Sequence, residues 1–214
     1  MPAPKITVGN VEIIGLVDTP FDLPWEIFFP GINVSEFEAF QELYPRSFGQ
    51  AGFHTQAGCY AIQSQGQTVL CDTGIGPGPI KFLGGIRGRL LDDMRDKGIP
   101  LEDVDTVVFT HLHGDHVGWN LSADRAPNFP KARFLVPQDD WEFFSKMANT
   151  NPQMQQVTPL QNLGLMELIS GETTITSEVT TYPTPGHTPG HTSILISSNG
   201  QRAIVTGDLA HHPA

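Results

Sequence analysis

Basic residues are scarce in this 214-residue chain, which carries 12 lysines and arginines against 23 aspartates and glutamates and a net charge of −11. The densest basic stretch, residues 81–95, is interleaved with acidic side chains. A surface with an excess of negative charge repels nucleic acid phosphates and anionic lipid head groups. We therefore expect neither nucleic acid nor a membrane as a partner.

Cysteines and long apolar runs are also few. The two cysteines, Cys59 and Cys71, exclude a disulfide scaffold and a four-thiolate zinc site, and we expect two buried free thiols in adjacent strands. No segment approaches the ~20 apolar residues of a membrane span. No apolar run follows a basic N-terminus in the manner of a signal peptide. These features favour a cytoplasmic location.

Glycine and proline, by contrast, are abundant, with 22 and 18 residues, which favours a fold with many loops over a helical bundle. The length suits a single domain over residues 1–214. Predicted strands come first as hairpins and then alternate with helices, which indicates an α/β protein of stacked layers. We expect strands at 6–8, 11–17, 59–63, 68–72, 106–110, 133–136, 174–182, 193–197 and 203–205, and helices at 86–97 and 138–147.

Phenylalanine is concentrated in residues 21–53, which hold seven of the 13 in the chain. Within this segment, Ser35 and Glu38 form a capping box that predicts a short helix. Aromatic density between two predicted strands favours a lid or insertion over an apolar substrate pocket, and the alternative is core packing beneath a loop. The predicted pocket residues are Trp25, Phe28 and Phe29.

The sequence HLHGDH at residues 111–116 directly follows a predicted buried strand. Residues two apart at a strand end point to the same side, so His111 and His113 can hold one metal ion. Gly114 permits a sharp turn, which directs Asp115 and His116 to a neighbouring position. Imidazole and carboxylate ligands suit zinc, and less selectively iron, manganese or cobalt.

Two further motifs follow, TPGHTPGH at residues 184–191 and TGD at 206–208. The first holds its histidines between Pro-Gly turns, and the second ends a predicted strand with Asp208. A carboxylate has two oxygens and can bridge two cations, so the three motifs predict a centre for two divalent metal ions. The DTG at residues 72–74 also suggests an aspartic protease, but that chemistry needs two such carboxylates, and we interpret Asp72 as a structural residue of its glycine turn.

These motifs, in this order, resemble the metallo-β-lactamase superfamily. The resemblance implies an αββα sandwich with the metals at one edge of the two sheets, and a hydrolase whose metal-bridging hydroxide attacks the substrate. In the implied roles, Asp115 also orients the attacking water or carries its proton, and His191 is a neighbouring structural group. The implied metal ligands are His111, His113 and His187 for the first ion, Asp115 and His116 for the second, and Asp208 as the bridge.

Within the superfamily, the phenylalanine-rich segment and the sequence GDLAHHP at 207–213 look most like the lactonase and organophosphate-hydrolase branch. The implied substrate is a small lactone, ester or phosphotriester, with quorum-quenching hydrolysis of an N-acyl-homoserine lactone favoured. Lactonase relatives often place a substrate-contacting tyrosine three residues after the bridging aspartate, where this chain has His211. The alternatives are a mononuclear iron persulfide dioxygenase and a glyoxalase II-like thioesterase.

The chain extends only six residues beyond Asp208, to Ala214. In the superfamily, the second metal normally takes another histidine from a loop well beyond this aspartate, and His212 could replace it only through a tight turn. We therefore expect a sandwich truncated at its C-terminus, with a weak second metal site and uncovered apolar surface. The chain is then either an inactive or incomplete fragment, or a homodimer whose other chain completes the site.

Overall fold

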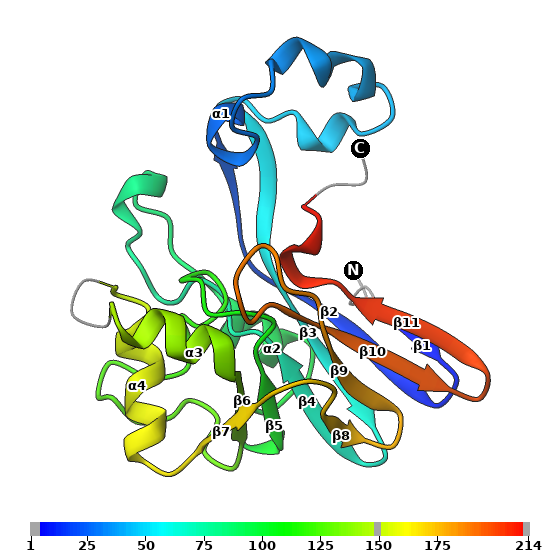
Figure 1. Ribbon diagram of the computed structural model, residues 1–214. Helices are drawn as coiled ribbons and strands as arrows, with labels where there is room; N and C mark the ends of the chain where they lie inside the picture. The colour runs from blue at the N-terminus through cyan, green and yellow to red at the C-terminus, as the bar shows by residue number, and fades with distance from the viewer. Residues whose placement is uncertain (1–4, 148–150, 212–214) are drawn as a thin grey trace.

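The structure is a computed structural model that describes residues 5–147 and 151–211. Two β-sheets form the centre of the molecule, and helices cover one of them (Figure 1). The described residues thus form three successive layers, helices, larger sheet and smaller sheet, which is an α/β arrangement without the second helical layer that an αββα sandwich implies. Among the described residues, no helix is long and apolar enough to cross a membrane.

The larger sheet has seven strands in the order β1 to β7. Strands β1 to β4 form antiparallel hairpins, whereas β4 to β7 run parallel because helices or long loops connect them. Their bounds are β1 Lys5–Val8, β2 Val11–Leu23, β3 Phe53–Ser64, β4 Gln67–Cys71, β5 Thr106–Val108, β6 Arg133–Pro137 and β7 Met166–Ile169.

The smaller sheet is antiparallel, with the order β11-β10-β9-β8. Its strands are β8 Thr174–Thr176, β9 Val179–Pro183, β10 Thr192–Ser198 and β11 Gln201–Val205. Buried side chains from this sheet, such as Ile194 and Val179, pack against Val69 and Leu135 of the larger sheet to form the inter-sheet core. Both faces of the central strands are therefore covered, which explains their nearly continuous apolar sequences.

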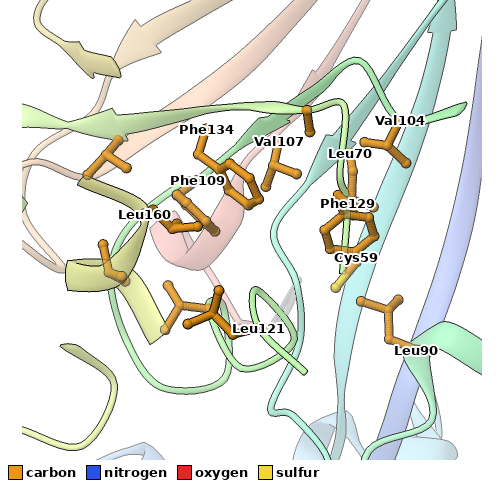
Figure 2. Packing of buried hydrophobic residues seen from close by; sticks show 14 of the residues in the cluster. Cys59, Leu70, Leu90, Val104, Val107, Phe109, Leu121, Phe129, Phe134 and Leu160 are labelled. Atoms are coloured by element: carbon orange, nitrogen blue, oxygen red, sulfur yellow. The ribbon is translucent and has the colours of Figure 1, made fainter. Parts of the chain in front are cut away.

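The helical layer consists of α2 Leu90–Asp96, α3 Gln138–Ser145 and α4 Met154–Asn162. Apolar residues on these helices form the helix-side core with the outer face of the larger sheet. Figure 2 shows Leu90 and Leu160 in this core together with Phe109 and Phe134. Cys59 belongs to the helix-side core and Cys71 to the inter-sheet core. Both cysteines are free and buried, which confirms that prediction.

Residues 24–52, here called the flap, extend away from the sheets between the ends of β2 and β3 (Figure 1, top). The flap consists of α1 Trp25–Phe28 and the 3-10 turns η1 Val34–Glu36, η2 Glu38–Phe40 and η3 Pro45–Ser47. Its interior is an aromatic cluster in which the Trp25 ring lies 4.8 Å from Phe37, 5.0 Å from Phe48 and 5.3 Å from Phe53. Packing of these rings against one another stabilises the flap.

Several sequence-based expectations were wrong in detail. The capping box of Ser35 and Glu38 does not form, because Asn33 caps the turn by accepting a hydrogen bond from the Ser35 N–H (3.2 Å) and the chain continues as 3-10 turns. The expected strand at 174–182 is a hairpin that turns between β8 and β9. The expected helix at 86–97 begins only at Leu90. Helix α4 and strand β7 were not predicted.

Candidate metal centre

The centre lies where strands from both sheets end, below the flap (Figure 1). The loop after β5 carries His111, His113 and His116, and the loop between β9 and β10 carries His187. Asp208 lies in the 3-10 turn η6 Gly207–Leu209, directly after β11. The two sheets thus bring together residues that are almost one hundred positions apart in the sequence.

Three ring nitrogens converge on one point. His113 Nδ1 lies 3.0 Å from His111 Nε2 and 3.0 Å from His187 Nε2. Burial lowers the pKa of all three histidines, so their rings stay neutral, which is the form that binds metal. These residues form a group that can hold one ion.

The Asp208 carboxylate lies between this group and His116. Its Oδ2 atom is 3.4 Å from His187 Nε2 and 3.9 Å from His111 Nε2, whereas its Oδ1 atom is 3.5 Å from His116 Nε2. Burial alone would raise the pKa of Asp208, but its hydrogen bonds with His116 and His211 outweigh burial and lower that pKa. Asp208 is therefore an anion whose two oxygens face opposite sides, as a bridging ligand requires.

Asp72 fixes the orientation of His116. Its Oδ2 atom accepts hydrogen bonds from His116 Nδ1 (2.9 Å) and the Thr110 hydroxyl (2.8 Å), and its Oδ1 atom accepts from the Thr110 N–H (2.8 Å). The opposite nitrogen of His116 therefore points toward Asp208. This agrees with a structural role for Asp72, and it extends that role from the glycine turn to a histidine of the centre.

The charge balance at His116 fits a cation. Burial by itself lowers the pKa of His116, but the carboxylates of Asp72, Asp115 and Asp208 outweigh it and raise that pKa well above the ordinary value. The centre thus has more negative charge than its own residues neutralise. Imidazole nitrogens and carboxylate oxygens form a donor set that zinc and similar divalent ions accept, and binding would displace the proton from His116.

Asp115 and His211 lie at the rim. The Oδ2 atom of Asp115 is 3.7 Å from His116 Nε2, its side chain is 40% exposed, and it belongs to none of the three possible ligand groups found among the described residues. His211 Nε2 lies 3.1 Å from Asp208 Oδ2, and this hydrogen bond raises the pKa of His211. His211 forms a further possible group with His187 and Asp208. His212 lies outside the described residues.

His191 is buried behind the cluster and supports Asp208 through the main chain. Its Nε2 atom accepts a hydrogen bond from the Asp208 N–H (3.1 Å), so its other nitrogen carries the proton and donates to the Thr184 carbonyl (3.1 Å). A side chain on Gly207 would collide with this ring, because its Cβ would lie 2.8 Å from His191 Nε2. His191 belongs to none of the three ligand groups in the described structure.

Two buried aspartates that connect distant segments were missed from the sequence. Asp18 interrupts the apolar run of β2, and this interruption was a usable signal. Asp140 lies beside Asp139 in the first turn of α3, and nothing local distinguishes the two. Only the fold shows that Asp140 is buried and contacts both histidine loops.

A cavity of about 910 Å³ opens over the centre. Its floor includes five of the proposed ligands and His211, and its apolar wall includes Leu23, Ile27 and Phe28. The structure brings Phe28 to this cavity, where its ring lies 5.2 Å from His211. The other two predicted pocket residues, Trp25 and Phe29, are not among its lining residues and pack within the aromatic cluster.

Comparisons with known proteins show the family and the fold. The family model described as the metallo-beta-lactamase superfamily matches residues 54–213. The uncharacterized protein YobT of Bacillus subtilis (strain 168) is 30% identical over 159 residues, which are 70% of this chain and 60% of YobT. The chain thus aligns with less than two thirds of that relative's length.

Two solved structures share the fold. The hydrolase AbOPH of the beta lactamase superfamily superposes with a TM-score of 0.82 at 24% identity, over 99% of this chain and 75% of AbOPH. The dizinc quorum-quenching lactonase AidC, in complex with a homoserine product, gives a TM-score of 0.75 at 22% identity, over 95% and 73% of the two chains. The fold class predicted from the motifs is confirmed, and the chain belongs to the metallo-beta-lactamase superfamily.

Proposed function

We propose that this chain forms the active site of a metal-dependent hydrolase that uses two divalent ions, with zinc favoured, to cleave a lactone, ester or phosphotriester. One observation carries the proposal: the two oxygens of Asp208 face different histidine nitrogens on the floor of a cavity with an apolar wall. Such a wall suits an acyl chain or an aromatic leaving group. The fold shared with AidC supports an N-acyl-homoserine lactone as the favoured substrate.

The ligands divide between two positions. His111, His113 and His187 would hold the first ion, and His116 with Asp115 would hold the second. Asp208 would contact both ions. When bound, two such ions lower the pKa of a water molecule and polarise the carbonyl or phosphoryl oxygen of the substrate.

Side chains at the cavity would transfer the proton and bind the substrate. Asp115 is partly exposed beside His116, so it can accept the proton of the attacking water and pass it to the leaving alcohol. His211 lies between Asp208 and Phe28, where its ring can donate a hydrogen bond to a substrate oxygen. Ile27 and Phe28 would pack against the apolar part of the substrate and exclude water from it.

The cavity also bears on the two alternative functions. A mononuclear iron dioxygenase would leave His116 without a role, although His116 faces the second oxygen of Asp208. A glyoxalase II-like thioesterase would need cations to bind the carboxylates of glutathione. Among the described residues that line the cavity, none is a lysine or an arginine. The first feature favours two ions over one, and the second favours an uncharged substrate over a glutathione thioester.

The test combines elemental analysis with assays on N-hexanoyl-homoserine lactone, an aryl phosphotriester and a glutathione thioester. We expect His113→Ala to lose bound metal and lactone hydrolysis together. The substitution removes His113 Nδ1, which lies 3.0 Å from the ring nitrogens of both His111 and His187. His54→Ala is the matched control, since His54 lies outside all three ligand groups and pairs with Asp22.

Retention of both metal and activity in His113→Ala would overturn the proposed ligand set. Full metal binding without turnover of any of the three substrates would overturn hydrolysis by this chain. One iron per chain with oxygen consumption on a persulfide would identify the dioxygenase instead.

A further inference from the structure

We propose that Asp140 is a positioning residue that joins the two histidine loops of the metal centre and sets the spacing of their ligands. The inference rests on the proposed function for the identity of those ligands. Asp140 lies in the first turn of α3, is completely buried, and has no contact with the cavity. It therefore acts through other residues and not on a substrate.

The contacts of the Asp140 carboxylate are divided between the loops. Its Oδ2 atom accepts hydrogen bonds from the Leu112 N–H (3.0 Å) and from the Thr188 hydroxyl (2.9 Å). Its Oδ1 atom accepts one from the Gly190 N–H (2.6 Å). Leu112 separates His111 from His113 in the sequence, and Thr188 directly follows His187. One side chain thus holds the immediate neighbours of all three first-ion ligands.

The second loop lies directly against the start of α3. A Cβ atom on Gly190 would be 2.5 Å from the Asp140 nitrogen, closer than any real side chain allows. Gly190 therefore lets the loop backbone approach until its N–H reaches the carboxylate. The position of the His187 loop is fixed by this contact as well as by its connections to β9 and β10.

No ion pair to Asp140 occurs among the described residues, so its charge is balanced by neutral donors. A buried carboxylate is costly unless its oxygens accept hydrogen bonds, and all three donors here come from the two loops. Displacement of the His187 loop would leave Oδ1 without a donor, and displacement of the other loop would remove one of the two donors to Oδ2. Asp140 therefore resists changes in the 3.0 Å distances that separate His113 Nδ1 from His111 Nε2 and from His187 Nε2.

The test measures metal binding, so it does not depend on turnover of any substrate. Asp140→Asn keeps the shape but replaces one acceptor oxygen with an amide nitrogen that cannot accept. We expect it to weaken the tighter Zn²⁺ site by roughly 10- to 100-fold in chelator competition. The visible absorption bands of the Co²⁺-substituted protein should shift, because they report ligand geometry. Asp139→Asn, at the exposed neighbour, should match the unmodified protein in both measurements.

A second pair of variants keeps the test valid if Asp140→Asn does not fold. Thr188→Val removes one hydrogen bond to Asp140. It should change the Zn²⁺ affinity and the Co²⁺ spectrum in the same direction as Asp140→Asn, but by a smaller amount. Thr188→Ser keeps the hydroxyl and should match the unmodified protein in both measurements. Unchanged affinity and Co²⁺ spectrum in Asp140→Asn and Thr188→Val, even with a lower Tm, would show that Asp140 only stabilises the fold. Hydrolysis could fail in every variant without affecting these readouts.

Discussion

Buried carboxylates connect the loops of this molecule at the scale of single residues. Asp18, Asp72 and Asp140 are each buried, and each accepts three or more hydrogen bonds from segments that are distant in the sequence. None of them is paired with a lysine or an arginine in the described structure. Backbone N–H groups and uncharged side chains supply all the donors to Asp18 and Asp140, and Asp72 adds His116 to such donors, which suits a chain with few lysines and arginines.

Removal of Asp18 should destabilise the protein without touching a metal ligand. Its carboxylate accepts hydrogen bonds from the Ile75 N–H (2.6 Å), the Leu90 N–H (2.7 Å) and Trp119 Nε1 (2.9 Å). Asp18→Ala leaves three buried donors unpaired, at about 1–3 kcal/mol each, so we expect the free energy of unfolding to fall by about 3 kcal/mol or more. Urea unfolding followed by fluorescence measures this loss.

Asp18→Asn provides the graded comparison, because it keeps the size and one acceptor oxygen and should cost less. Asp92→Asn on the exposed surface of α2 should leave stability nearly unchanged. Equal unfolding midpoints for Asp18→Ala and Asp92→Asn would contradict the role given to Asp18.

The candidate ligands could be chosen from the sequence because their spacing is local. HLHGDH places His111, His113 and His116 at the end of one strand, and this pattern is visible without knowledge of the fold. The role of Asp140 could not be predicted in this way, because its partners lie 28 to 50 positions away. The assignment of the ligands stays a prediction until metal is measured.

At the scale of elements, the flap divides into a cavity wall and an internal cluster. Phe28 lines the cavity, whereas Phe37 is not among its lining residues and packs 4.8 Å from the Trp25 ring and 4.6 Å from the Phe29 ring. We expect Phe28→Ala to raise KM for long-chain lactones by up to about tenfold and for short ones much less, since the acyl chain loses apolar contact. Steady-state kinetics over a series of acyl lengths measures the difference.

Phe37→Ala is the matched control for the flap. It should lower thermal stability and affect substrates of all lengths equally, because it disturbs the cluster and not the wall. If Phe28→Ala behaved in the same way, the phenylalanines would be core residues beneath a loop, which was the alternative derived from the sequence.

Most strands were predicted correctly from short β-branched and apolar runs. The elements that were not predicted lack a clear apolar pattern. Helix α4 contains Pro159 and several glutamines, so only Met154, Val157 and Leu160 mark its buried face. Strand β7 buries only its last residue, Ile169, and so lacks a clear alternation. In the flap, the capping box of Ser35 and Glu38 was misleading, because Asn33 caps the chain there and it continues as 3-10 turns.

At the scale of the whole molecule, the metal centre connects the two sheets. The larger sheet supplies His111, His113 and His116, and the smaller sheet supplies His187 and Asp208. An ion bound by these residues would therefore stabilise the docking of one sheet on the other. At a free ion concentration 100 times Kd, this linkage contributes about 2.7 kcal/mol.

Metal titration should distinguish two unequal sites. The first position has three histidine nitrogens beside Asp208, whereas the second has His116, Asp208 and the partly exposed Asp115. We expect one ion to bind at least about tenfold more tightly than the other, and chelation to lower the Tm by roughly 5–10 °C. Two ions with equal, tight affinity in the monomer would contradict this.

Apolar side chains remain exposed where β1, β3 and β11 border the cavity. Ile6 is 59% exposed, Ile204 47% and Tyr60 40%. Uncovered apolar surface was expected from the sequence, and exposure of this kind favours association. The homodimer and the C-terminal truncation stay predictions.

The two cysteines can report how the layers of the molecule separate when it opens. They lie in adjacent strands but in different cores, Cys59 under the helices and Cys71 between the sheets. Burial raises the pKa of both thiols well above the ordinary value, so each is inert toward an alkylating reagent until its own core opens. Mass spectrometry of labelled peptides would thus give two separate opening rates from one natural chain.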